Sequence, residues 1–123
     1  MADQQSGSDF SLTPATFHIL LALADGERHG YAIMQAVAQE TGGTMRLGPG
    51  TLYRSIRVML AHNLIAETDE RPDPTLDDER RRYYRLTDPG KHVLQTEIER
   101  LIRIVQLAQA KPLLAKPQPG GAL

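Results

Sequence analysis

The sequence predicts a mainly α-helical protein with one small β-hairpin and a long C-terminal helix. Three observations support this fold class. Between residues 12 and 63, three apolar-periodic segments are separated by glycine and proline. Two runs rich in strand-forming residues then flank a polar loop. A final run, residues 88–111, repeats apolar residues at intervals of four and three.

The first helix is expected to begin after Thr13 and to end before Gly26. Threonine is a favourable N-cap, Pro14 suits the first helical position, and glycine commonly follows the last turn of a helix. Phe17 and Leu21 lie on one apolar face of this helix.

Glycines also delimit the second and third helices. The second begins near Gly30 and stops at Gly42 and Gly43, and the third begins within residues 48–51 and ends at Asn63. The third helix carries a stripe of apolar residues that we expect to be buried: Leu52, Ile56, Met59 and Leu60.

Residues 64–70 and 81–87 predict the two strands of a hairpin, with Tyr84 facing the core. The loop between them holds prolines and acids, which do not pack into a core. Residues 12–87 thus have the element order of a winged helix-turn-helix domain, followed by a helix over residues 88–111. We expect residues 1–11 to be a flexible tail and residues 112–123 a disordered one.

Composition narrows the class of protein. The chain has 123 residues, no cysteine and a net charge of −1, which indicates one domain without disulfides. It shows no signal-peptide pattern and no apolar run of about 20 residues, so we expect a soluble, cytoplasmic protein without a membrane partner. The four histidines lack metal-site spacing, and no P-loop or nucleophile elbow is present. We therefore expect no enzyme activity, no cofactor and no metal.

The third helix is unusual in its charges. Residues 41–66 contain arginines and no Asp or Glu, and Arg54 and Arg57 point away from the apolar stripe together with Thr51. Such a face suits a phosphate-lined groove, because a carboxylate there would be repelled. Arginine also reads guanine, and Thr or Tyr bonds phosphates or bases. The alternative is an ordinary solvated face that carries two arginines.

The hairpin loop adds a second cationic segment. Its first part is acidic, and Arg80, Arg81 and Arg82 follow. Such a limb is suited to contact a phosphate backbone or the minor groove. The alternative is that the acids and arginines of this loop pair with one another, an arrangement that contributes little to stability.

Four segments, in this order, resemble the PadR family of bacterial transcriptional regulators. They are "HGYAI", "GPGTLYRSIRVML", "LI" and "RRYYRLTDPGKHVL". The resemblance extends from about residue 12 to about residue 110, and the single C-terminal helix resembles the compact subfamily. It implies a winged-helix DNA-binding protein that forms a two-fold dimer and usually acts as a repressor.

The resemblance also implies roles for individual residues. Tyr31 matches a tyrosine that lies near the DNA backbone in relatives. Gly50, Thr51 and Tyr53 match the start of the recognition helix, where Thr and Tyr face DNA. This sequence has Arg54 where many members have proline, which leaves its base preference open. From the residues alone, Tyr53 is also suited to a half-buried packing role.

The last helix predicts a dimer seam. Its apolar residues repeat as in a coiled coil, and a helix of about 24 residues reaches about 36 Å, which is more than so small a domain covers. The surplus is expected to pack on a second copy, with the first helix contributing. The alternative is a helix folded wholly onto its own domain. The residues predicted at the dimer interface are Phe17, Leu21, Leu94, Ile98, Leu101, Ile102 and Val105.

The sequence therefore predicts a sequence-specific DNA-binding regulator, a repressor that binds a pseudo-palindromic double-stranded operator as a homodimer. Release by an unidentified small-molecule effector is left open. The alternative is a winged-helix module that binds only protein.

Overall fold

The computed structural model describes residues 12–68, 71–72 and 80–115. The expectations for residues 1–11 and 116–123, and for the acidic part of the loop at residues 73–79, lie outside these ranges.

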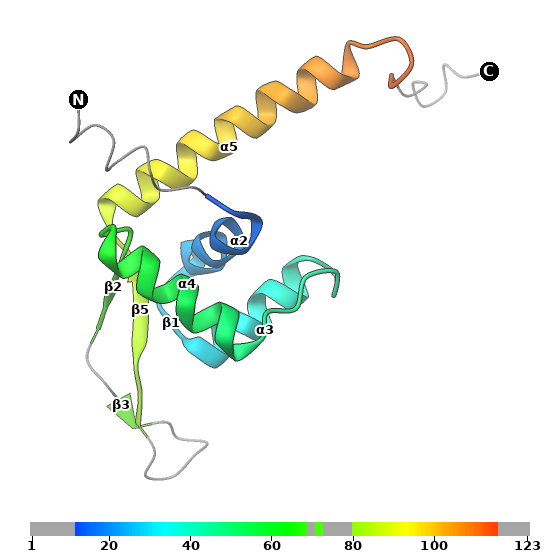
Figure 1. Cartoon of the computed structure of the whole chain (residues 1–123). Coiled ribbons are helices and arrows are strands. Elements are labelled where there is room, and N and C mark those ends of the chain that lie inside the picture. Colours follow the sequence, from blue (N-terminus) through cyan, green and yellow to red (C-terminus); the bar gives the residue numbers. More distant parts are fainter. Residues whose placement is uncertain (1–11, 69–70, 73–79, 116–123) are drawn as a thin grey trace.

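Three helices form the body of the domain, in the predicted order (Figure 1). They are α2 (Pro14–Ala22), α3 (Gly30–Glu40) and α4 (Pro49–Ala61), and a short 3-10 turn, η1 (Leu23–Asp25), extends α2. Thr13 caps α2 as predicted, because its side-chain oxygen accepts a hydrogen bond of 3.2 Å from the Thr16 backbone N–H. Gly26 follows the 3-10 turn with a φ of 138°, which favours glycine.

The ends of α3 and α4 share one hydrogen-bond pattern. After α3, Gly42 has a φ of 62°, and the Gly43 N–H donates to the Ala38 carbonyl at 2.7 Å. After α4, Asn63 has a φ of 60°, and the Leu64 N–H donates to the Met59 carbonyl at 2.9 Å. Both are Schellman-type ends, in which a left-handed residue turns the chain out of the helix.

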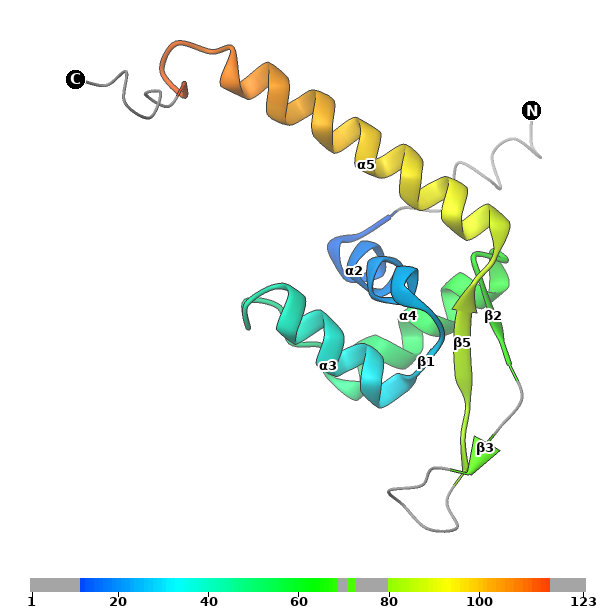
Figure 2. The ribbon, with the colours of Figure 1, turned by 180° about the vertical axis from the view of Figure 1, so that it is seen from behind.

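The β-structure is larger than the predicted hairpin. The strands are β1 (Arg28–His29), β2 (Ile65–Glu67), β3 (Arg71–Pro72), β4 (Arg80–Arg81) and β5 (Tyr83–Leu86). β2 and β5 pair antiparallel as predicted, and β1 adds a third strand on the other edge of β5. β3 and β4 form a separate ladder that carries the hairpin beyond the helical body (Figure 2).

The core lies between the three helices and the three-stranded sheet. Leu52, Ile56 and Met59 of the predicted stripe are buried, and Leu60 is partly buried. Tyr84 of β5 is buried as predicted. Burial of the apolar face of α4 fixes which side of this helix faces outward.

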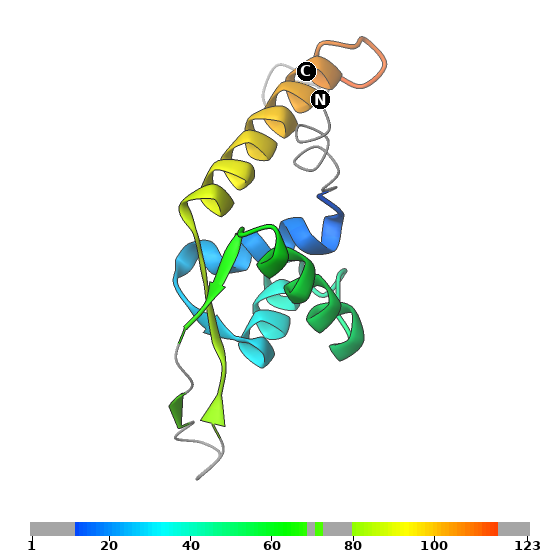
Figure 3. The same cartoon turned by 60° about the vertical axis from the view of Figure 1, so that its left-hand side comes forward.

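The long helix α5 (Asp88–Gln109) begins on the domain and then runs away from it (Figures 1 and 3). Thr87 caps it by accepting a hydrogen bond of 3.0 Å from the Gly90 N–H, and the Thr87 hydroxyl donates to the Asn63 carbonyl at 2.7 Å. Gly90 is buried against the Leu64 carbonyl, so a side chain there would collide with the backbone. With 22 residues the helix is about 33 Å long, and Leu94 is its last buried residue.

Residues 111–115 form a turn after α5, although the sequence predicted a disordered tail from residue 112. The backbone N–H groups of Leu114 and Ala115 both donate to the Lys111 carbonyl at 3.0 Å. Within the described ranges, no helix combines the length and the apolar character needed to cross a membrane.

Candidate nucleic-acid interface

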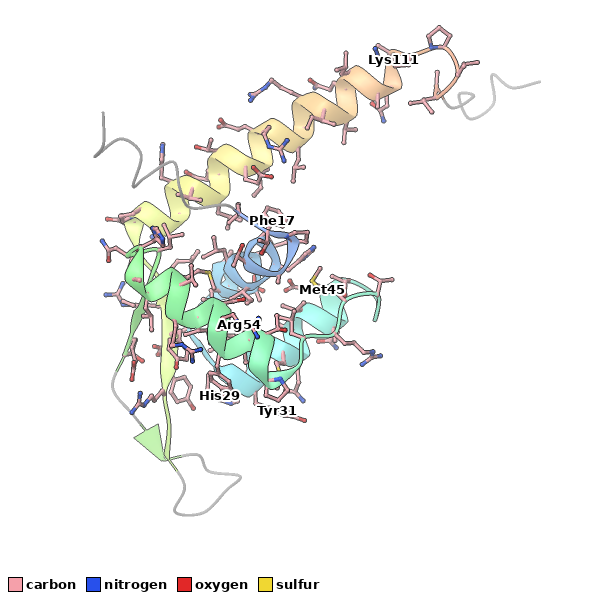
Figure 4. All side chains as sticks on the ribbon, in the orientation of Figure 1. Phe17, His29, Tyr31, Met45, Arg54 and Lys111 are labelled. Carbon is pink, nitrogen blue, oxygen red and sulfur yellow. The ribbon has the colours of Figure 1, made fainter. Side chains whose placement is uncertain are left out.

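The outward face of α4 carries the residues that the sequence assigned to DNA. Gly50, Thr51, Arg54 and Arg57 are exposed on α4, whereas Leu52 of the same helix is fully buried. Arg54 lies almost opposite the buried stripe at 100° per residue, and Figure 4 marks its place on α4. The first turn of α4 contains no acid, and the whole helix is free of acidic residues.

The beginning of α4 is open to an anion. Its N-cap is Gly48, which has no side chain to accept a hydrogen bond, and Pro49 occupies the first turn. The first hydrogen bond of the helix is donated by Leu52 to the Gly48 carbonyl at 2.9 Å. The N–H groups of Gly50 and Thr51 precede it and have no partner within the helix. Together with the helix dipole, such groups favour a phosphate.

The start of α3 lies at the same end of the domain. His29 caps α3, because its Nδ1 accepts a hydrogen bond of 3.1 Å from the Ala32 N–H. Tyr31 is 52% exposed at the first turn. Figure 4 shows His29 and Tyr31 below α4, on the side of the domain away from α5.

Tyr53 joins the two helix starts. It is 43% exposed, and its ring lies against Gly30, the first residue of α3. The sequence showed Gly30 and Tyr53 as separate motif residues, and their contact was not predicted. Covariation between these two positions in related sequences is the signal that could have revealed the contact before the structure was known.

Of the three arginines predicted to contact DNA from the wing, which is the hairpin of β2 and β5 with the β3–β4 ladder, only Arg82 has a described side chain. Arg82 is exposed, and its Nε lies 3.4 Å from a carboxylate oxygen of Glu67 on the neighbouring strand. Arg80 and Arg81 form β4, and only their backbone is described. Arg82 is therefore already paired with an acid, but this acid belongs to β2, and the loop acids with which the arginines were expected to pair lie outside the described residues.

Electrostatics at the base of the wing also involve Tyr84. Burial raises the pKa of Tyr84 above its ordinary value, and the charge of Glu67 and the hydroxyl of Tyr53 raise this pKa further. The positive charge of Arg82 lowers the pKa of Tyr84. Tyr84 therefore stays neutral, and Tyr53, Glu67 and Arg82 all lie close enough to influence it.

The residues predicted at the dimer interface fall into three groups. Leu94 is buried in the core of its own chain, so it cannot also face a partner. The apolar periodicity of α5 correctly placed Leu94 on an apolar face, but it did not show that the chain's own core covers this part of the face. Phe17, Leu21 and Ile98 are partly buried against this core, and Leu101 is partly buried. The remaining two are exposed on the distal half of α5: Ile102 and Val105.

Further exposed apolar residues lie near the end of α5. Ile104 and Leu107 are 45% and 60% exposed, and Leu113 of the following turn is 97% exposed. Together with Ala108 and Leu114, they line an apolar groove between the helix and the turn. Among the described residues, no group of three or more His, Asp or Glu side chains is gathered as for a metal ion.

A protein-family model for the "Transcriptional regulator PadR-like family" matches residues 19–96. The chain belongs to the PadR-like family of transcriptional regulators. This match confirms the resemblance that the four motif segments indicated. It also agrees with the prediction that the chain is a regulator and not an enzyme, since PadR-like proteins are transcriptional regulators.

Solved structures show the same fold. A transcriptional regulator from Clostridium thermocellum is 24% identical and covers 77% of this chain and 91% of its own, with a TM-score of 0.61. A PadR-family regulator from Clostridium difficile is 25% identical, with coverages of 76% and 94% and a TM-score of 0.61. Bacillus subtilis PadR in complex with operator DNA is 23% identical, with coverages of 72% and 48% and a TM-score of 0.61.

A curated relative is longer than this chain. An uncharacterized 37.1 kDa protein in transposon TN4556 of Streptomyces fradiae is 37% identical over 86 residues. The match covers 70% of this PadR-family chain and 22% of the Streptomyces protein, so the chain spans about a fifth of that relative.

Proposed function

We propose that this PadR-family regulator represses transcription by binding a pseudo-palindromic operator as a homodimer. In each copy, α4 enters the major groove with Arg54 and Arg57 toward DNA. Gly50 and Thr51 offer their backbone N–H groups to a phosphate. Tyr31 lies near the DNA backbone, and the wing residues Arg80, Arg81 and Arg82 follow the neighbouring phosphates.

The observation that carries this proposal is the character of the α4 surface. An exposed helix face bears two arginines and no acid, and it continues into a helix start that no side chain caps. A purely protein-binding module has no need to exclude acids from one helix, whereas a duplex repels every carboxylate placed in its groove. In support, B. subtilis PadR, which has the same fold, was solved in complex with operator DNA.

Dimer formation is supported by the distal half of α5. Ile102, Val105 and Leu107 are each more than half exposed in the single chain, and Ile104 is 45% exposed. Apolar residues at this density along one helix are typical of an interface. A two-fold dimer places two copies of α4 about one DNA turn, roughly 34–36 Å, apart, and this spacing predicts a pseudo-palindromic operator.

Repression follows when the bound dimer occludes a promoter. Because both α4 helices must meet their half-sites together, a ligand that changes the angle between the copies would weaken binding. A small-molecule effector therefore remains part of the proposal without an identified chemistry.

An electrophoretic shift with the DNA upstream of the chain's own gene tests the function. We expect a specific complex whose affinity falls steeply between two salt concentrations, because bound arginines release counterions from the duplex. If no duplex from this region is bound and the chain instead captures only protein partners, the alternative of a protein-binding module is correct.

A further inference from the structure

Gly30 occupies a position where the backbone does not require glycine. It is the first residue of α3, it is buried, and its φ lies outside the left-handed range. Alanine forms helices better than glycine does. The reason for glycine must therefore be the space around its Cα.

That space is filled by Tyr53. A Cβ built on Gly30 would overlap the Tyr53 hydroxyl and would lie 3.0 Å from Cζ and 3.2 Å from Cε1 of the ring. The hydroxyl end of the ring thus occupies the volume of the missing side chain. This contact brings the first residue of α3 directly against the second turn of α4.

The contact lies at the centre of the proposed DNA-facing surface. Tyr31 follows Gly30, and Arg54 follows Tyr53, so each partner is adjacent to a residue assigned to DNA. Two elements of this surface, the start of α3 and the second turn of α4, therefore meet at one side chain.

We propose that Tyr53 is a positioning residue for DNA recognition, whose ring rests on Gly30 and fixes the spacing between the starts of α3 and α4. This inference rests on the proposed DNA-binding function. Groups that bind one rigid ligand must hold their places within about 0.5 Å. The ring, and not a hydrogen bond from its hydroxyl to DNA, is then the important part of Tyr53.

The test measures binding of the full chain to a fluorescent operator duplex and to a scrambled duplex of equal length. Gly30→Ala pushes the Tyr53 ring away and is expected to lower operator affinity about tenfold, while affinity for the scrambled duplex changes much less. Tyr53→Phe keeps the ring and is expected to stay within about threefold of wild type. The double variant G30A/Y53F is expected to recover much of the affinity lost in Gly30→Ala, because the overlapping hydroxyl is absent. Gln35→Ala, an exposed change on α3, is the matched control.

Two further measurements keep the inference testable if Gly30→Ala folds poorly. Tyr53→Leu removes the ring without adding a group at Gly30, and we expect it to bind the operator about tenfold more weakly than Tyr53→Phe. Amide chemical shifts of the free protein should move at the starts of both α3 and α4 in Gly30→Ala and return toward wild type in the double variant.

The outcomes separate the two proposals. If wild type binds no operator, the proposed function is wrong. The amide chemical shifts of the free protein then test whether the Tyr53 ring rests on Gly30. If wild type binds, the inference is overturned by wild-type operator affinity in Gly30→Ala. It is also overturned by a loss in Tyr53→Phe as large as that in Tyr53→Leu, which would assign the role to the hydroxyl.

Discussion

Replacing Arg54 by alanine removes one cation from the centre of each proposed DNA-contacting surface. Arg54 is exposed on α4, and alanine is also a good helix former, so stability should change by less than about 0.5 kcal/mol. A dimer loses two cations. If both lie on phosphates, the slope of log affinity against log salt becomes shallower by about 1.8. Between about 50 and 200 mM salt, the affinity of the variant should then fall about tenfold less than that of wild type.

Fluorescence anisotropy with a labelled operator at four or more salt concentrations measures this slope. Arg103→Ala is the matched control, because it removes the same charge from an exposed position of α5 and should leave the slope unchanged. An Arg54→Ala slope equal to that of wild type would refute the placement of α4 on the phosphates. An equal decrease of the slope in Arg54→Ala and Arg103→Ala would also refute this placement, because it would show that only the net charge of the chain matters.

Three further predictions concern the interface, the wing and the start of α5. Val105→Glu should convert the dimer to a monomer in sedimentation velocity, whereas Gln106→Glu, which adds the same charge on the polar face, should remain dimeric; monomers in both variants or in neither would contradict the predicted seam. Glu67→Gln removes the acid that pairs with Arg82, so affinity for scrambled DNA should rise and its salt dependence should steepen; an unchanged affinity would show that this ion pair does not limit non-specific binding. Gly90→Ala places a Cβ on a backbone carbonyl and should lower the free energy of unfolding by about 1–3 kcal/mol or more in urea denaturation, and wild-type stability would disprove this close packing.

Helix boundaries could be predicted well because their signals are local. Thr13, Thr87 and Asn63 act within one turn of their own position, as a cap or as a left-handed residue, and each does so in the structure. The inward orientation of Tyr84 followed from strand alternation in the same way.

Features that depend on distant segments could not be predicted. β1 has only two residues, so it shows no alternation, and it exists because β5 returns beside it. The contact between Gly30 and Tyr53 likewise joins two motifs that are far apart in the sequence. Leu94 shows the related limit of periodicity: the repeat identified an apolar face of α5, but the first part of that face is covered by the chain's own core.

The candidate site was predicted as a set of residue types on one helix face. The exposure of Arg54 and Arg57 agrees with that prediction, since charge and period determine which side of α4 faces outward. The pairing of Arg82 with Glu67 was not predicted, because a strand register is needed to bring the two side chains together. The DNA-binding roles of these residues stay predictions until binding is measured.

The central claim is that two copies of this chain hold one duplex through paired α4 helices. Native mass spectrometry of the chain mixed with a molar excess of operator duplex tests it most directly. We predict a complex of two chains and one duplex as the dominant bound species, even when protein is scarce. A dominant complex of one chain and one duplex under the same conditions would contradict the account.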